Sequence, residues 1–118
     1  MNVLIVENDQ SLGRLWAEHI VRLGLNAEFV QTQAAAVTAM QDDKFDVLIL
    51  NLNLKEGSAL AVADYASFKL PKAKAIFVTS NSFFSDGSIF SFMSNACALV
   101  PRRTPPDDLA ALADYHSR

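Results

Sequence analysis

The chain has 118 residues, 51% of them hydrophobic, and 13 acidic against 10 basic side chains give a formal net charge of -3. This length fits a single domain over residues 1–118, and the scattered bases argue against direct nucleic-acid binding. One cysteine, Cys97, cannot form an internal disulfide, and a buried, inert thiol is expected there. No basic leader precedes Val3 and no apolar run reaches the ~18 residues that span a bilayer, so we expect a cytoplasmic protein.

Short apolar runs alternate along the chain with segments of helical period. Strands are predicted at residues 3–6, 27–30, 47–50, 75–78 and 98–100, because these runs are short and mostly β-branched or aromatic. Helices are predicted at residues 12–23, 34–40, 59–68, 82–94 and 109–115, the first ending at Gly24. Strands that are apolar throughout and separated by helices indicate a parallel sheet covered on both faces. The sequence therefore predicts an α/β fold, an open (βα)5 three-layer sandwich.

Polar side chains directly follow four of the five predicted strands. They are Glu7, Asn8 and Asp9 after the first, Asn51 and Asn53 after the third, Thr79 and Ser80 after the fourth, and Arg102 and Arg103 after the fifth. In open parallel sheets, ligands bind beyond the carboxyl ends of the strands. We therefore expect these side chains to converge on one crevice.

Three stretches, residues 3–12, 45–57 and 77–80, resemble the receiver domains of response regulators in two-component signalling. The resemblance runs from about residue 2 to 116 and rests on the order and spacing of these stretches. It implies a flavodoxin-like fold with strand order 2-1-3-4-5 and a role in phosphorelay signal transduction rather than an enzymatic one.

The resemblance also shows where this chain departs from the receiver pattern. Asn51 stands at the position of the phospho-accepting aspartate, and Asn8 at that of a carboxylate that binds magnesium, whereas Glu7 keeps the first acidic position. Asn53 falls where the family offers a backbone carbonyl to the metal. A neutral amide cannot attack phosphorus, so Asn51 is predicted not to be phosphorylated. Magnesium prefers carboxylate and phosphate oxygens, so we expect weak binding at best unless Asp9 turns inward.

Three further positions carry over from the resemblance. Thr79 retains the hydroxyl that would contact a phosphoryl group, Leu99 stands where many relatives have a switching Tyr or Phe, and Arg102 replaces a lysine. Arginine pairs with carboxylates through a rigid fork, so Arg102 could reach Glu7 or Asp9 and hold the crevice in one state. The alternative is that Arg102 points into solvent.

The segment over residues 82–94 is the predicted contact surface. Phe83, Phe84, Phe90 and Met93 are expected at or outside the edge of the core, and neighbouring exposed apolar groups indicate a contact surface. Together with the last strand and helix, this surface is predicted to bind a protein partner or a second copy of the chain. In the alternative, Phe83 and Phe84 fold under the preceding loop.

The remaining aromatic side chains are predicted to pack in or beside the core: Trp16, Phe29, Phe45, Phe68 and Phe77. Two other functions stay open. The chain could be the receiver half of a DNA-binding regulator, or a small flavodoxin-like enzyme. The enzyme is disfavoured because no glycine precedes Gly13 in the first loop to wrap phosphates, and no catalytic Cys–His or Ser–His–Asp spacing occurs.

Overall fold

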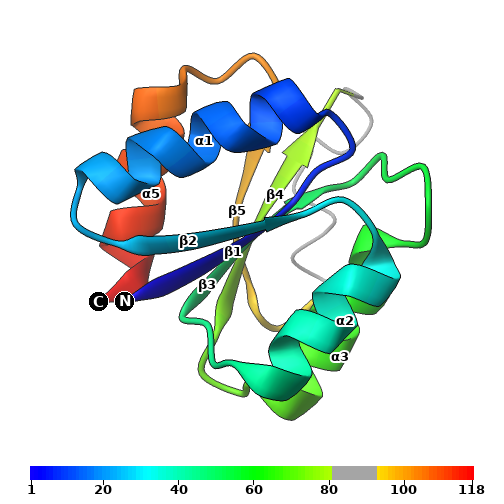
Figure 1. Cartoon of the computed structure of the whole chain (residues 1–118). Coiled ribbons are helices and arrows are strands. Elements are labelled where there is room, and N and C mark those ends of the chain that lie inside the picture. Colours follow the sequence, from blue (N-terminus) through cyan, green and yellow to red (C-terminus); the bar gives the residue numbers. More distant parts are fainter. Residues whose placement is uncertain (81–92) are drawn as a thin grey trace.

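The computed structural model describes residues 1–80 and 93–118, and it contains one five-stranded parallel sheet (Figure 1). The strands are β1 (Asn2–Val6), β2 (Asn26–Val30), β3 (Val47–Asn51), β4 (Lys74–Thr79) and β5 (Ala96–Pro101), in the order β2-β1-β3-β4-β5. The described helices are α1 (Gln10–Arg22), α2 (Gln33–Asp42), α3 (Ala59–Lys69) and α5 (Pro106–Ser117). The predicted flavodoxin-like fold is confirmed. The helix predicted over residues 82–94 lies almost entirely outside the described residues.

The helices form a layer on each face of the sheet (Figure 1). On one face, α1 and α5 pack on alternate strand residues such as Ile5 and Ile49. On the other, α2 and α3 pack on their neighbours, including Leu4 and Leu48. Successive side chains of a strand point to opposite faces and both faces are covered, so the central strands are apolar throughout residues 3–6, 47–50 and 75–78. This packing fixes the carboxyl ends of β1, β3 and β4 side by side.

Polar side chains cap the helices that begin close to the carboxyl ends of the strands. Asp9, Thr32 and Ser58 each accept a hydrogen bond from a backbone N–H in the first turn of α1, α2 and α3. The predicted turn after α1 is also present, because Gly24 has a φ of +89°. The β3–α3 loop contains the second left-handed glycine, Gly57, which has a φ of +94°.

Three packing predictions need correction. Phe68 was expected in or beside the core but is 83% exposed, because the buried residues Val62 and Ala66 turn the opposite side of α3 towards the sheet. Met93 was expected to face outward but is half-buried and packs against the α2–α3 side of the core. Cys97 is half-buried rather than buried, because β5 is an edge strand of the sheet.

No helix within residues 1–80 and 93–118 is long and apolar enough to cross a membrane. The cytoplasmic location stays a prediction.

Candidate functional site

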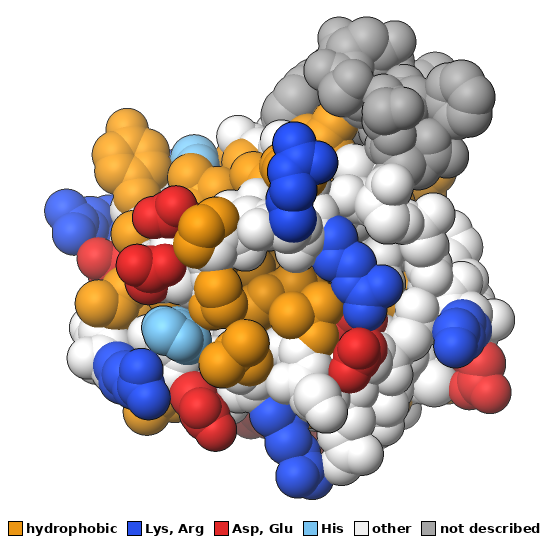
Figure 2. All heavy atoms as spheres, turned by 90° about the horizontal axis from the view of Figure 1, so that it is seen from above, with side chains coloured by type: hydrophobic (Ala, Val, Ile, Leu, Met, Phe, Trp, Pro, Cys, Tyr) orange, Lys and Arg blue, Asp and Glu red, His pale blue; other side chains and the backbone are white. Residues whose placement is uncertain are grey.

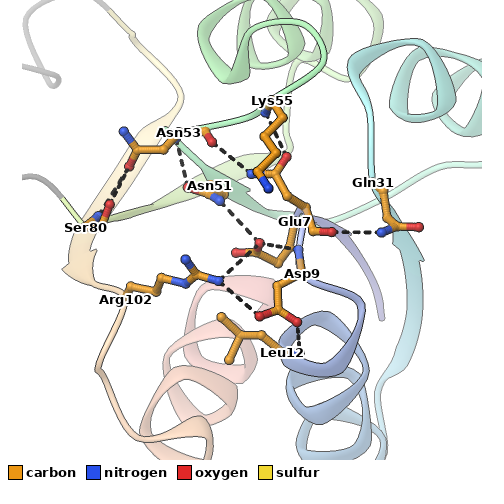
Figure 3. A network of polar contacts seen from close by, with 10 residues as sticks. Glu7, Asp9, Leu12, Gln31, Asn51, Asn53, Lys55, Ser80 and Arg102 are labelled. Carbon is orange, nitrogen blue, oxygen red and sulfur yellow. Dashed lines mark hydrogen bonds and ion pairs between the residues drawn. The ribbon is translucent and has the colours of Figure 1, made fainter.

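Glu7 lies at the carboxyl end of β1 and is completely buried (Figure 3). Its Oε2 accepts hydrogen bonds from the backbone N–H of Asp9 at 2.7 Å and from Nδ2 of Asn51 at 3.3 Å. Its Oε1 is also buried but has no hydrogen-bond partner within the described part of the chain. Burying a carboxylate is costly unless donors or positive charges compensate, so the groups around Glu7 decide what the crevice can hold.

Asn8 joins the two loops that border the crevice (Figure 3). Its Nδ2 donates to the backbone carbonyl of Asn53 at 2.8 Å, and its Oδ1 accepts from the backbone N–H of Lys55 at 2.8 Å. Gln31, directly after β2, donates to the backbone carbonyl of Asn8 at 2.8 Å. The side-chain amide of Asn8 thus acts as donor and acceptor at once, which a carboxylate at this position could not do.

Asn51 ends β3 and is 2% exposed. In addition to the bond from its Nδ2 to Glu7, its Oδ1 accepts from the backbone N–H of Asn53 at 2.8 Å. The side chain of Asn53 continues the network, because its Oδ1 lies 3.1 Å from the hydroxyl of Ser80 and 3.3 Å from its backbone nitrogen. Thr79, buried at the end of β4, completes this row of strand ends.

Arg102 follows β5 and reaches back across the crevice (Figure 3). Its Nη2 lies 3.4 Å from Oδ2 of Asp9 and 3.8 Å from Oε2 of Glu7. The backbone N–H of Arg102 donates to the carbonyl of Thr79 at 2.9 Å, which anchors the start of the loop. The sequence left open whether Arg102 reaches these carboxylates or points into solvent; in the structure it reaches both.

Two of the other predicted residues do not join this network. Leu99 is half-buried and packs against the α2–α3 side of the core, and Arg103 is exposed. Phe83, Phe84 and Phe90 lie outside the described residues. Sequence reasoning missed two contributors. Gln31 could have been found, because it directly follows a strand, whereas Lys55 contributes only its backbone N–H and so leaves no residue-type signal.

Several solved structures with the same fold are receiver domains. A CheY-like response regulator receiver domain protein from Methanospirillum hungatei JF-1 matches with a TM-score of 0.87 at 20% identity, over 98% of this chain and 92% of that one. The signal receiver domain of a putative Luxo repressor protein from Vibrio parahaemolyticus matches with a TM-score of 0.84 at 22% identity, over 98% and 88%. This chain has the receiver-domain fold.

A third receiver structure was solved with bound ligands. The response regulator TrrA from Thermotoga maritima, in complex with Mg(2+)-BeF, matches with a TM-score of 0.81 at 22% identity, over 98% of this chain and 97% of that one. No protein-family model and no curated protein matches the chain.

The receiver fold implies a magnesium ion at this crevice, but the donor set here does not fit one. Glu7 is the buried carboxylate, and its Oε2 already faces an amide NH₂ and a guanidinium. The carbonyl oxygen of Asn53 is occupied by the amide of Asn8. Within residues 1–80 and 93–118, no three His, Cys, Asp or Glu side chains are placed to hold a metal ion. A divalent cation would meet hydrogen-bond donors and a positive charge where it needs oxygen ligands.

Proposed function

We propose that this chain is a receiver-like signalling domain that is not phosphorylated at its acceptor position and acts through protein–protein contacts. The fold supports a signalling role because the neighbouring structures are receiver domains. The observation that carries the rest of the proposal is the buried amide of Asn51 at the end of β3.

Asn51 lacks the chemistry of an acceptor. Phosphoryl transfer to a side chain needs an oxygen lone pair with nucleophilic character, and a carboxamide oxygen is neutral and delocalised into the C–N bond. Both polar atoms of this side chain are already used, Oδ1 as an acceptor from Asn53 and Nδ2 as a donor to Glu7. No described residue of the crevice would activate the amide, and no enzymatic reaction is proposed for it.

The amides and Arg102 pair with Oε2 of Glu7 and with the two loops beside it, whereas Oε1 of Glu7 has no partner among the described residues. In this proposal, Asn8 holds the two loops together without a metal, and the guanidinium of Arg102 balances the buried charge of Glu7. The crevice therefore needs neither a cation nor a phosphoryl group to be ordered, and it keeps one arrangement. A domain fixed in one arrangement does not signal by changing its conformation. It signals through the identity of the protein that it binds.

Apolar surface supports a role in protein contacts. Exposed large apolar side chains include Tyr115 of α5, at 68%, and Val21 of α1, at 56%. Figure 2 shows apolar side chains gathered over the α1 and α5 side of the molecule, among charged ones. Such groups of exposed apolar side chains are typical of contact surfaces. A partner protein or a second copy, bound through residues 82–94, β5 and α5, remains our proposal for the output.

The test uses amide NMR spectra of the wild type and of the double variant Asn8→Asp/Asn51→Asp. Each is titrated with Mg²⁺ and then with beryllofluoride as a phosphoryl mimic. We expect saturable shifts around the crevice only in the double variant, because two carboxylates restore a metal site. The variant Asn53→Asp is the control, since it adds a carboxylate without altering the acceptor position or position 8.

Incubation of the wild type with acetyl phosphate, followed by mass spectrometry of the intact protein, tests the acceptor directly. A phosphoryl adduct on the wild type, or saturable shifts of the wild type with beryllofluoride, would overturn the proposal. Unchanged wild-type spectra together with a responsive double variant would support it.

A further inference from the structure

The β3–α3 loop, residues 52–58, is held at the crevice by Asn8. The Oδ1 of Asn8 accepts from the backbone N–H of Lys55, and its Nδ2 donates to the carbonyl of Asn53, each at 2.8 Å. Every residue from 55 to 58 is exposed, so hydrogen bonds rather than apolar packing fix this part of the loop. Asn8 is therefore one anchor of the loop.

Gln33, in the first turn of α2, anchors the same loop from the other side. Its backbone N–H donates to the carbonyl of Glu56 at 3.2 Å, and its Oε1 accepts from the backbone N–H of Ser58 at 2.9 Å. Ser58 is also the N-cap of α3, because its hydroxyl accepts from the backbone N–H of Ala61. Gln33 thus fixes the last residue of the loop and, with it, the start of α3.

Gly57 lets the loop lie directly against Gln33. A Cβ at position 57 would lie 2.3 Å from Cβ of Gln33 and 2.7 Å from its Oε1, both far closer than van der Waals contact. The φ of +94° at Gly57 is also in the left-handed region, which glycine adopts without strain. The close approach therefore depends on glycine, and it brings the N–H of Ser58 within reach of Gln33.

Gln31 extends these contacts to the loop that carries Asn8. Its Nε2 donates to the backbone carbonyl of Asn8 at 2.8 Å. Only Thr32 separates Gln31 from Gln33, so one short segment after β2 holds both loops. The five hydrogen bonds involve only backbone groups and neutral side-chain amides. Because none of these groups is charged, the contacts are not screened by salt.

The two anchored residues of the loop follow each other directly in the sequence. Lys55 bonds to Asn8, and Glu56 bonds to Gln33. Because consecutive residues are joined by a rigid peptide unit, the loop cannot leave one anchor without disturbing the geometry at the other. We propose that Asn8 and Gln33 form one cooperative clamp, so that the β3–α3 loop opens and closes as a unit and loss of either anchor loosens both.

This clamp is a conformational device that places part of the crevice under the control of a side chain on α2. Gln33 borders a surface groove of about 530 Å³ together with Thr32 and Val37. At the crevice end of the loop, the backbone N–H of Asn53 donates to Oδ1 of Asn51 at 2.8 Å. Opening of the loop at Gln33 therefore loosens the partner of Asn51. The inference does not rest on whether position 51 accepts a phosphoryl group.

Amide hydrogen exchange, followed by NMR at mildly acidic pH, tests the coupling between the two anchors. In Gln33→Ala the informative probe is the N–H of Lys55, because its own acceptor on Asn8 is unchanged. We expect this N–H to exchange about 5-fold faster than in the wild type, the effect of one lost hydrogen bond on local opening. In the reciprocal variant, Asn8→Ala, the N–H of Ser58 should become faster by a similar factor, although Gln33 is intact. Gln41→Ala makes the same change at an exposed position of α2 and should alter neither probe.

Two further variants test which groups form the clamp. Gln33→Glu keeps an oxygen acceptor for the N–H of Ser58, so both probes should exchange as slowly as in the wild type. Gly57→Ala keeps every hydrogen-bonding group but forces the loop away from Gln33, so the N–H of Lys55 should exchange faster. Circular dichroism verifies that each variant remains folded. The proposal is overturned if Gln33→Ala leaves the exchange of Lys55 unchanged, if Asn8→Ala leaves that of Ser58 unchanged, or if Gly57→Ala has no effect on Lys55.

Discussion

The side-chain amide of Asn8 is hydrogen-bonded to the backbone carbonyl of Asn53, with 2.8 Å between Nδ2 and the carbonyl oxygen. These residues are 45 positions apart, and the bond joins the loop after β1 to the loop after β3. In the receiver pattern that the sequence resembles, that carbonyl faces a metal ion. Here the amide of Asn8 joins the two loops through a hydrogen bond, so no cation is needed to hold the two sides of the crevice together.

Asn8→Asp should lower the free energy of unfolding by about 1 kcal/mol at pH 7, because the donor to Asn53 is lost while the acceptor for Lys55 is kept. Urea unfolding followed by fluorescence measures this change. Gln41→Glu adds the same charge at an exposed position of α2 and should change the stability by less than about 0.5 kcal/mol. Equal stability of Asn8→Asp and the wild type would show that the amide does not join the loops.

Asn51→Asp should be more damaging than Asn53→Asp. A carboxylate at position 51 would replace the donor that lies 3.3 Å from Oε2 of Glu7, leaving two buried carboxylates face to face. We expect a loss of about 2–4 kcal/mol in the free energy of unfolding. At position 53, a carboxylate can still accept from Ser80 at the surface, so a change below about 0.5 kcal/mol is expected. Chemical denaturation of both variants in one buffer ranks them, and the reverse order would contradict the described site.

Arg102→Ala should destabilise the protein because it removes the cation beside the buried Glu7. The Arg102 side chain is 40% exposed and its charge is therefore partly screened by water, so we expect a loss of about 1 kcal/mol, smaller at high salt. Arg103→Ala removes the neighbouring exposed arginine and serves as the control. Thermal unfolding at low and high ionic strength measures both. If the two variants behave alike, Arg102 does not hold the crevice.

Gly13→Ala should destabilise the domain although alanine favours helices. A Cβ at position 13 would lie 2.1 Å from Cε1 of Phe29, so the ring must move. Overpacking costs about 1–3 kcal/mol, which exceeds the gain in helix propensity of about 1 kcal/mol. In a Phe29→Ala background the clash is gone, and Gly13→Ala should then stabilise the protein by about 1 kcal/mol. A double-mutant cycle from urea unfolding tests whether the sign reverses.

Cys97 should react slowly with thiol reagents in the folded protein. Burial raises the pKa of this thiol from 9.0 to about 11, with Lys74 acting in the opposite direction. Since the thiolate reacts, the rate of iodoacetamide labelling at pH 8 should be about 100-fold lower than in unfolded protein. The folded state holds this proton more tightly than the unfolded state, so its contribution to stability is present below pH 9.0 and is lost as the pH rises towards about 11. Equal labelling rates in buffer and in urea would exclude the shift.

Local sequence patterns were sufficient to predict the architecture. Short apolar runs identified all five strands, and β5 differs mainly in starting at Ala96 instead of residue 98. The rule that ligand-binding residues follow parallel strands gathered Glu7, Asn51 and Thr79 correctly at one end of the sheet. These features depend on residue type and on the spacing of apolar side chains, which repeats every two residues in strands and every 3.6 residues in helices. Such local patterns can be identified without knowing which distant residues are in contact.

Tertiary structure decided which of these side chains bond to which, and which side of a helix faces outward. The pairing of Asn8 with Asn53, and the position of Arg102 beside Glu7, depend on loops that are distant in sequence and meet only when the sheet forms. The exposure of Phe68 likewise depends on which side of α3 contacts the sheet, because both sides are apolar in the sequence. Periodicity identifies an apolar helix face, but only packing determines whether that face is covered.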